Sequence, residues 1–554
     1  MDRKTKIKAF ALQNAIRYNG KANEGAILGR LIAELKVERS DIPSFKKEVH
    51  DIVAAVNNLS VEEQGTRLKK LAPKMLEKKK QEHDLFGFLH IKKGEKVITA
   101  FPPEPSKYPH IGHAKSILVN YELAKQHKGK FILRFEDTNP ELVKKEFYDI
   151  HLENYAWLGV KPDKISYASD FMDTFNEKII HLLKEGHAYV TKASQDEIKT
   201  MRQKGIAVAE RNESPEAQLA RVEEMKTAEP GSMVILAKID LKHKNSTMRD
   251  PALMRIIDHD HPRLGKKYRL WPTYDLENAV MDGVQKITHR LRSKEFEMRN
   301  ELQRYLQRLL GLPETKIYEF ARFNLKGVES SGRLIREKIE KGEFTGWDDP
   351  RLTTLVALRR RGFQAKAIKD FALSTGLSKA EATLTWDDLI KHNKRLLDEE
   401  ADRYFFIADP IPIQIEGVES KTVLLPVHPR LKKGERKFTV TPLFFLDKND
   451  IGAMNDHALY RLMECCNFSK EGGNFQSLPG GIEEYRIGGR GIFHWLPQEE
   501  CVDATIMMPD CSEITGKAEL TIKKVKEGQV IQFERFGFCR RDDPKALSFR
   551  YTHK

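Results

Sequence analysis

Several features that mark other classes of protein are scarce in this chain of 554 residues. Its five cysteines all lie in the last hundred residues, and no two of them form a Cys-x-x-Cys pair. This argues against a zinc ribbon and favours reduced thiols in a cytoplasm. No stretch approaches the roughly 20 apolar residues that a membrane-spanning helix needs, so we expect neither membrane insertion nor secretion.

Negative charge is in the minority. The 95 Lys and Arg residues outnumber the 81 Asp and Glu residues, which gives a formal net charge of +14. Such an excess favours a polyanionic partner, although it supports solubility equally well. The length is sufficient for roughly three or four domains. Composition is therefore compatible with a nucleic-acid-binding protein of several domains, but it does not by itself indicate that function.

The most informative stretch joins a predicted buried strand, Val-Ile-Thr-Ala-Phe at 97–101, to a predicted helix. A proline-stiffened turn between them ends in His110, Gly112 and His113, which therefore lie at the helix start. The free N–H groups and the dipole of a helix start favour an anion, and glycine leaves room for a ligand. A further strand at 131–135 completes one parallel βαβ unit. The sequence thus predicts a site for a nucleotide phosphate.

Further motifs follow downstream. Arg-Phe-Glu-Asp-Thr at 134–138 ends the second strand, where parallel sheets place ligand-binding groups. Tyr-Asp-Leu-Glu-Asn lies at 274–278, and Thr-His-Arg-Leu-Arg at 288–292. The most specific motif is Gly-Trp-Asp-Asp-Pro-Arg at 346–351, because it serves no common structural purpose. Together with His-Ile-Gly-His at 110–113, these motifs resemble the class I aminoacyl-tRNA synthetases of the glutamyl and glutaminyl branch.

The resemblance runs from about Lys96 to Lys554 and is to the archaeal type of glutamyl-tRNA synthetase. It implies that the glutamate carboxylate attacks the α-phosphorus of ATP to give glutamyl-adenylate, after which the terminal ribose hydroxyl of tRNA attacks the carbonyl. No side chain acts as a nucleophile, so catalysis is positioning and charge stabilisation, with Mg²⁺. The implied substrates are ATP, glutamate and tRNA(Glu). Whether tRNA(Gln) is also accepted stays open.

The resemblance also assigns roles to individual residues. The ATP-binding and catalytic residues are expected to be His110, Gly112, His113, Ser331 and Arg333. Those that bind the amino acid are expected to be Glu136, Tyr274, Asn278 and Arg292. In this set, Glu136 contacts the α-amino group, and Arg292 supplies the bidentate fork that a carboxylate prefers. No metal ligand is assigned to the protein.

Some positions depart from the family pattern. Ala100 stands where an arginine usually binds a substrate carboxylate, and Gly332 stands where the catalytic loop usually has a lysine. Lys107 also replaces a commoner residue beside the histidines. We expect Arg333 to supply the charge that Gly332 lacks. Arg290 is a candidate to compensate for Ala100, although an exposed arginine at a strand end is the alternative interpretation.

Changes of pattern along the chain predict an α/β protein whose Rossmann-type parallel-sheet domain is split by an insertion. By the resemblance, the insertion binds the acceptor end of tRNA, and C-terminal antiparallel β-barrels bind the anticodon. We expect six segments, in chain order: a helical N-terminal extension (1–93), the first half of the catalytic domain (94–193), the insertion (194–267), the second half (268–318), a helical connector with the catalytic loop (319–403), and the β-barrels (404–554).

Two alternative functions remain open at this point. One is a glutaminyl-tRNA synthetase, a close relative within the same branch. The other is a tRNA-binding paralogue that has lost amino-acid activation through Ala100 and Gly332. The intact histidine motif and the motifs associated with tRNA argue against a complete loss of function.

Overall fold

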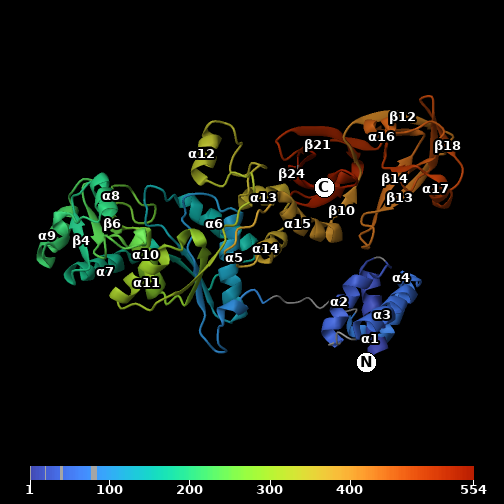
Figure 1. Cartoon of the computed structure of the whole chain (residues 1–554). Coiled ribbons are helices and arrows are strands. Elements are labelled where there is room, and N and C mark those ends of the chain that lie inside the picture. The colour runs from blue at the N-terminus through green and yellow to red at the C-terminus, as the bar shows by residue number, and fades with distance from the viewer. Residues whose placement is uncertain (1, 19, 36, 38–40, 76–83, 544) are drawn as a thin grey trace. The chain divides into compact units, whose positions relative to one another are not determined.

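The computed structural model describes residues 2–18, 20–35, 37, 41–75, 84–543 and 545–554 (Figure 1). The chain separates into two compact units, Met1–Asp84 and Leu85–Lys554. The first unit therefore ends before residue 93, where the sequence places the end of the helical extension.

The first unit, as far as it is described, contains α1 (Arg3–Arg17), α2 (Glu24–Leu35), α3 (Ile42–Asn57) and α4 (Val61–Leu71). In α3, Phe45, Val49 and Val53 recur at helical spacing and are buried. Helix α4 begins with a capping box, in which Ser60 and Glu63 each accept the other's backbone N–H. The predicted helical extension is thus a small helical unit with its own core.

A parallel sheet forms the centre of the second unit. Three strands pair in parallel in the order β1-β2-β3, and two more form a parallel pair: β1 (Ile98–Phe101), β2 (Lys130–Phe135), β3 (Lys164–Tyr167), β8 (His289–Ser293) and β9 (Lys316–Phe320). The Thr288 N–H donates to the Ile98 carbonyl at 2.9 Å, so β8 begins beside β1. Helix α5 (Ile111–Gln126) connects β1 to β2, which confirms the predicted βαβ unit. Further helices of this part are α6 (Lys145–Trp157), α10 (Tyr274–Val284) and α11 (Arg299–Leu309).

An antiparallel sheet interrupts this parallel one. It has the strand order β4-β5-β6-β7: β4 (Ala188–Thr191), β5 (Val234–Ala237), β6 (Ala252–Ile256) and β7 (Leu270–Pro272). Its neighbouring helices are α7 (Met172–Lys184), α8 (Gln195–Lys204) and α9 (Pro215–Met225). The sheet extends on both sides of the predicted insertion, 194–267, because its edge strands are β4 and β7. Short apolar strands do not reveal in sequence which sheet they will join.

A helical segment follows and consists of α12 (Gly332–Glu340), α13 (Leu355–Arg361), α14 (Ala365–Ser374) and α15 (Trp386–Glu400). Helix α13 is fastened to the end of the chain. Its Arg361 donates to the Thr552 carbonyl at 3.1 Å, and Arg360 forms an ion pair with Asp542 at 2.9 Å. Of the helices that the structure describes, none is both long enough and apolar enough to cross a bilayer.

The C-terminal part is built from strands, with the short helices α16 (Lys448–Gly452) and α17 (Ile482–Gly488). One seven-stranded sheet has the order β10-β23-β24-β25-β21-β22-β11, a second has β19-β16-β17-β18-β12-β15-β20, and β13 and β14 form a hairpin. Their bounds are β10 (Asp402–Tyr404), β11 (Phe406–Ile407), β12 (Pro410–Glu416), β13 (Lys421–Pro426), β14 (Glu435–Val440), β15 (Leu443–Asp447), β16 (Tyr460–Leu462), β17 (Asn467–Glu471), β18 (Asn474–Leu478), β19 (Gly491–Phe493), β20 (Leu496–Pro497), β21 (Cys501–Met507), β22 (Glu513–Glu519), β23 (Val530–Phe533), β24 (Gly537–Asp543) and β25 (Ser548–His553).

Both sheets are rolled. The edge strands of the first, β10 and β11, follow one another in the chain, and so do β19 and β20 at the edges of the second. The two edges of each sheet must therefore approach each other, as in a barrel. Most neighbouring strands are antiparallel, although β10–β23, β12–β18, β16–β19 and β21–β25 are parallel. The predicted fold class, α/β with a helical extension and C-terminal barrels, is confirmed.

Candidate active site

A cavity of about 840 Å³ lies where β1 and β2 end and α5 begins. Its lining residues come from the segments 101–107, 110–116, 136–142, 272–277, 293–296, 320–323 and 330–336, and from Arg255 in β6. Most of the predicted site residues line it: His110, Gly112, His113, Glu136, Tyr274, Ser331 and Arg333. Asn278 and Arg292 are not among the lining residues.

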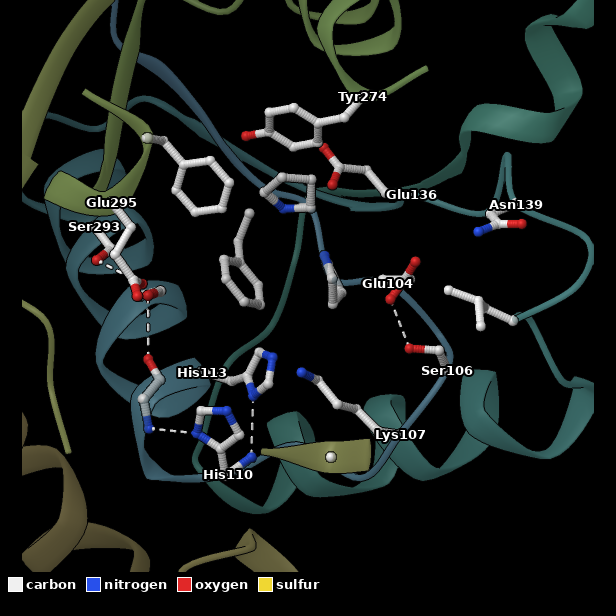
Figure 2. A pocket seen from close by; sticks show the side chains of 18 of the residues that line it. Glu104, Ser106, Lys107, His110, His113, Glu136, Asn139, Tyr274, Ser293 and Glu295 are labelled. Carbon is white, nitrogen blue, oxygen red and sulfur yellow. Dashed lines mark hydrogen bonds between the residues drawn. The ribbon is translucent and has the colours of Figure 1, made fainter. Parts of the chain in front are cut away.

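Figure 2 shows two ends of this cavity. Lys107, His110 and His113 lie at one end, which we call the histidine end. Glu136 and Tyr274 lie at the other end. Glu277 also lines the cavity and lies close enough to Glu136 for the two carboxylates to interact, and we call these three residues the carboxylate end. The groups predicted for phosphate and those predicted for the amino acid are thus brought into one cavity.

The two histidines cap helix α5 with their own side chains. Nδ1 of His110 accepts from the Gly112 N–H at 3.0 Å, and Nδ1 of His113 accepts from the His110 N–H at 3.1 Å. The Ile111 N–H donates to the Thr353 carbonyl at 2.9 Å. The expectation that these N–H groups are free for an anion is therefore wrong, because imidazole nitrogens and a neighbouring carbonyl already accept them.

This hydrogen-bond pattern fixes the protonation of both rings. A neutral imidazole that accepts at Nδ1 carries its proton on Nε2, so each ring offers an N–H donor there. Burial lowers the pKa of His110 to about 3 and that of His113 well below its usual value, and the nearby charge of Lys107 acts in the same direction. Both rings are neutral at pH 7. The two imidazoles therefore offer an anion hydrogen-bond donors that carry no formal charge.

The segment leading into α12 supplies another part of the wall. Ser331 caps this helix by accepting the Leu334 N–H at 3.5 Å. The side chain of Arg333 is 78% exposed, and its Nη1 lies 3.5 Å from Oε1 of Glu337, one turn further on. Arg333 therefore lies at the rim of the cavity, with an acidic partner.

Glu136 follows β2 and faces the cavity with an unsatisfied carboxylate. Its Oε1 is buried without a hydrogen-bond partner among the described residues. Two guanidinium groups approach this atom, with Nη2 of Arg134 and Nη2 of Arg290 each at 3.9 Å. Burial raises the pKa of Glu136 to about 7, although both arginines oppose this. A carboxylate with an oxygen that accepts no hydrogen bond at this position suits an ammonium group.

A buried ion network lies behind Glu136. Asp282 accepts from Nη1 of Arg134 at 2.9 Å and from Nη1 of Arg290 at 2.7 Å. Gln303 donates to its other oxygen at 2.8 Å. Burial alone would raise the pKa of Asp282, but Arg290 and Arg134 hold it below its usual value. The network therefore fixes both arginines close to Glu136.

Asn278 and Arg290 differ from their predicted roles. Oδ1 of Asn278 accepts from Nη2 of Arg290 at 2.9 Å, and its Nδ2 donates to the Tyr274 carbonyl at 3.0 Å. The Asn278 side chain is thus used within the wall and does not contact the cavity. Arg290 is buried rather than exposed, and its guanidinium is held by Asp282, by Asn278 and, at 3.9 Å, by Glu136. Arg290 is thus engaged within the wall and is not among the residues that line the cavity, where it would have to be to compensate for Ala100.

Arg292 is also partly engaged. Its Nε donates to Oδ1 of Asn300 at 3.1 Å, its Nη2 donates to the same atom, and its Nη1 donates to the Tyr274 hydroxyl at 3.4 Å. The Tyr274 ring stacks on Phe296 with centroids 5.3 Å apart. Burial raises the pKa of Tyr274 to about 12, so the hydroxyl keeps its proton. The predicted fork of Arg292 thus connects to the cavity through Tyr274.

Comparison with known families assigns nearly the whole second unit. The family described as "tRNA synthetases class I (E and Q), catalytic domain" matches residues 96–399. The chain belongs to the class I tRNA synthetases of the E and Q type. Two families described as "tRNA synthetases class I (E and Q), anti-codon binding domain" match residues 401–487 and 492–542 of this synthetase chain.

Curated relatives of this class I synthetase chain align with it from end to end. The glutamate–tRNA ligase of Pyrococcus furiosus is 37% identical over 567 residues, which cover 98% of each chain. That of Methanothermobacter thermautotrophicus is 36% identical over 99% of each chain, and that of Nitrosopumilus maritimus is 35% identical over 100% of this chain and 99% of its own. The resemblance inferred from the motifs is confirmed, and it extends to the helical first unit.

The cavity of this synthetase also contains residues to which the sequence gave no role. Glu277 lines the carboxylate end, where its Oε2 accepts from the Thr138 hydroxyl at 2.6 Å, and burial raises its pKa well above the usual value. Its position three residues after Tyr274 places both on one face of α10, and this spacing could have revealed it. Lys107 is another such residue, and the only signal for it in the sequence is that it departs from the family pattern.

Proposed function

We propose that this protein is a glutamate–tRNA ligase. It activates glutamate with ATP to give glutamyl-adenylate and pyrophosphate, and it transfers the glutamyl group to the 3′ end of tRNA(Glu). The main support is one cavity that combines neutral imidazole donors at its histidine end with the Glu136 carboxylate at its other end, whose buried Oε1 has no hydrogen-bond partner among the described residues. The names of the end-to-end relatives point to the same reaction. Because tRNA charging serves translation, we assign the protein to the cytoplasm.

In this proposal ATP lies at the histidine end. His110 and His113 donate from Nε2 to phosphate oxygens, where charge builds up on the leaving pyrophosphate. Gly112 allows the close packing of the turn, since a Cβ there would lie 2.8 Å from Cε1 of His110. Ser331 and Arg333 approach the nucleotide from the start of α12.

Glutamate lies at the carboxylate end. The ionised Glu136 accepts the α-ammonium group, and the Tyr274 hydroxyl donates to the substrate. Asn278 and Arg292 act as positioning residues, the first by holding Arg290 and the second by contacting Tyr274. The α-carboxylate of glutamate is itself the nucleophile, so these groups contribute by orienting it towards the α-phosphorus.

We include Mg²⁺ as an ion that arrives with ATP, where it would neutralise phosphate charge. The described part of the chain holds no group of three His, Cys, Asp or Glu side chains arranged for a metal. Mg²⁺ does not need such a group, because it usually keeps several waters and is bound by substrate phosphates together with one or two carboxylates. Glu104, which lines the cavity, is the candidate carboxylate.

The tRNA acceptor end has a route to the same cavity. A second cavity of about 390 Å³ shares Arg255 and Tyr274 with the first and is also lined by Arg202 and Arg299. Three arginines there favour a phosphate backbone. We propose that the inserted domain guides the acceptor end through this cavity, while the barrels from residue 404 onwards bind the anticodon.

The test is ATP–pyrophosphate exchange by the full-length protein with either amino acid, glutamate or glutamine, and with tRNA(Glu) or tRNA(Gln). We expect exchange with glutamate in the presence of tRNA(Glu). Exchange with glutamine alone would identify a glutaminyl-tRNA synthetase, and tRNA binding without exchange would identify an inactive paralogue. Glutamate exchange supported by tRNA(Gln) would add that tRNA to the substrates.

A further inference from the structure

We propose that Lys107 is the cation that binds the ATP phosphates in this chain, and that Gly332 is small because the lysine side chain occupies the space beside it. The inference rests on the proposed function, since it assigns the phosphate charge of that reaction. Lys107 precedes His110 in the turn between β1 and α5. It lines the cavity, and Figure 2 shows its side chain extending towards His113.

The backbone of Lys107 is fixed while its side chain is not. The buried His151 donates from Nε2 to the Lys107 carbonyl at 2.9 Å, and its Nδ1 is 2.8 Å from the Tyr155 hydroxyl. We find no hydrogen bond or ion pair between the Lys107 ammonium and any described residue. The turn therefore presents a cation whose partner is not within the described protein.

The other cations near this end are already engaged. Nη2 of Arg336 donates to the Ser106 carbonyl at 3.0 Å. Arg322 pairs with Glu295 at 3.4 Å, and Arg333 pairs with Glu337 at 3.5 Å. Arg255 also lines the cavity, but it is shared with the second cavity. Lys107 is thus the cation of the histidine end that is best placed for a ligand.

Gly332 and Lys107 are in direct steric contact. A Cβ at position 332 would lie 2.5 Å from Cδ of Lys107 and 3.4 Å from its Cβ. A side chain at 332 and the observed Lys107 conformation therefore exclude each other. The two departures from the family pattern, at 107 and 332, are one structural feature in which the cation comes from the turn instead of the loop.

Such a cation complements the Mg²⁺ that arrives with ATP. His110 and His113 are neutral, so they donate hydrogen bonds but cannot balance the charge of the phosphates. An ammonium is a compact point charge on a flexible stem, which can follow the leaving pyrophosphate. Its attraction for phosphate is strong in a site that excludes water.

The first experiment compares Lys107→Gln with the wild type, with Lys161→Gln as a matched control, since Lys161 is exposed and is not among the residues that line the cavity. We expect Lys107→Gln to lower tRNA-dependent exchange by about 10²- to 10³-fold. It should weaken MgATP binding by about 10- to 100-fold. The affinity for tRNA and the activity of Lys161→Gln should stay at wild-type levels.

The second experiment moves the cation across the cavity. Gly332→Ala should lower exchange in the wild type, because its Cβ displaces Lys107, yet have little effect on Lys107→Ala. The double variant with Lys107→Ala and Gly332→Lys should recover much of the lost exchange. Recovery by a relocated charge would not occur if Lys107 served only to stabilise the fold.

The two proposals fail in different ways. A wild type that binds MgATP but shows no exchange would contradict the proposed ligase, while weaker MgATP binding by Lys107→Gln would still support the phosphate role. A Lys107→Gln variant with wild-type exchange and wild-type MgATP binding would overturn the role of Lys107. Equal effects of Gly332→Ala with and without the lysine would overturn its link to Gly332.

Discussion

The two ends of the cavity handle charge in opposite ways. At the histidine end, His110 and His113 are neutral and bonded to the backbone, and the Lys107 ammonium has no partner among the described residues. At the carboxylate end, Arg134 and Arg290 form a buried network in which they share the single anion Asp282. The histidine end thus offers hydrogen-bond donors and one ammonium group to a negatively charged phosphate. The carboxylate end holds its arginines and Asp282 in fixed positions, and its Glu136 carboxylate faces the ligand.

This difference implies different consequences of mutation. Charges in the buried network cannot be solvated when a partner is lost, so the fold itself depends on them. Removing a neutral imidazole of the histidine end costs the fold only a helix-capping hydrogen bond, about 0.5–2 kcal/mol, but it costs catalysis more.

The largest effect should follow the loss of the Asp282 charge. Asp282→Asn leaves Arg134 and Arg290 buried without their shared anion, which should destabilise this domain by about 3–5 kcal/mol. Chemical denaturation followed by tryptophan fluorescence measures the change. Asp258→Asn is the control, since that ion pair with Arg269 is solvent-exposed and should contribute little. Similar shifts in the two variants would contradict the buried network.

His113→Ala should leave the fold intact and impair the chemistry. Loss of one donor to the developing phosphate charge should lower tRNA-dependent ATP–pyrophosphate exchange by about 10²- to 10³-fold, or 2.7–4 kcal/mol. The affinity for tRNA should change little. His259→Ala, which alters an exposed histidine, controls for a general effect of removing imidazole. Unchanged exchange in His113→Ala would exclude this histidine from the site.

The carboxylate end should give the reaction a pH dependence. The raised pKa of Glu136, about 7, means that the group is neutral below this pH and ionised above it. Because the α-ammonium group needs the ionised form, kcat/KM for glutamate should fall below pH 7 by up to about tenfold per pH unit. Glu136→Gln should bind glutamate poorly at every pH and show no such break. A break that persists in this variant would have to come from another group.

Arg333→Ala should have the smallest effect. Its side chain is 78% exposed and already faces Glu337, so we expect exchange to fall by less than about tenfold. The same assay applied to Lys107→Gln provides the comparison. A larger loss from Arg333→Ala than from Lys107→Gln would show that the loop supplies the main phosphate charge.

Local sequence predicted the histidine end because its parts are neighbours in the chain. The apolar run at 97–101 and the spacing after His113 correspond to β1 and α5, and Gly112 lies at the start of α5, as expected. The sequence could not show that the imidazoles accept the backbone N–H groups. That outcome depends on side-chain rotamers and on the Thr353 carbonyl, which comes from a distant segment.

The carboxylate end was predicted only in part, because its residues converge from β2, α10 and β8. The motifs assign all four residues, Glu136, Tyr274, Asn278 and Arg292, to amino-acid binding without distinguishing between them. Packing decides which side chains line the cavity and which lie behind them, and it places Glu136 and Tyr274 in front. The relation between Lys107 and Gly332 was equally invisible, since their contact is a property of the folded chain.

Transfer of the glutamyl group to tRNA is the step that distinguishes a glutamate–tRNA ligase from both alternative functions. The decisive measurement is the transfer of labelled glutamate or labelled glutamine to purified tRNA(Glu) by the full-length protein with ATP and Mg²⁺. We predict an ester of glutamate at the 3′ end of the tRNA, which requires ATP and disappears in His113→Ala. Esterification of glutamine in its place, or tRNA that stays uncharged although it is bound, would contradict the account.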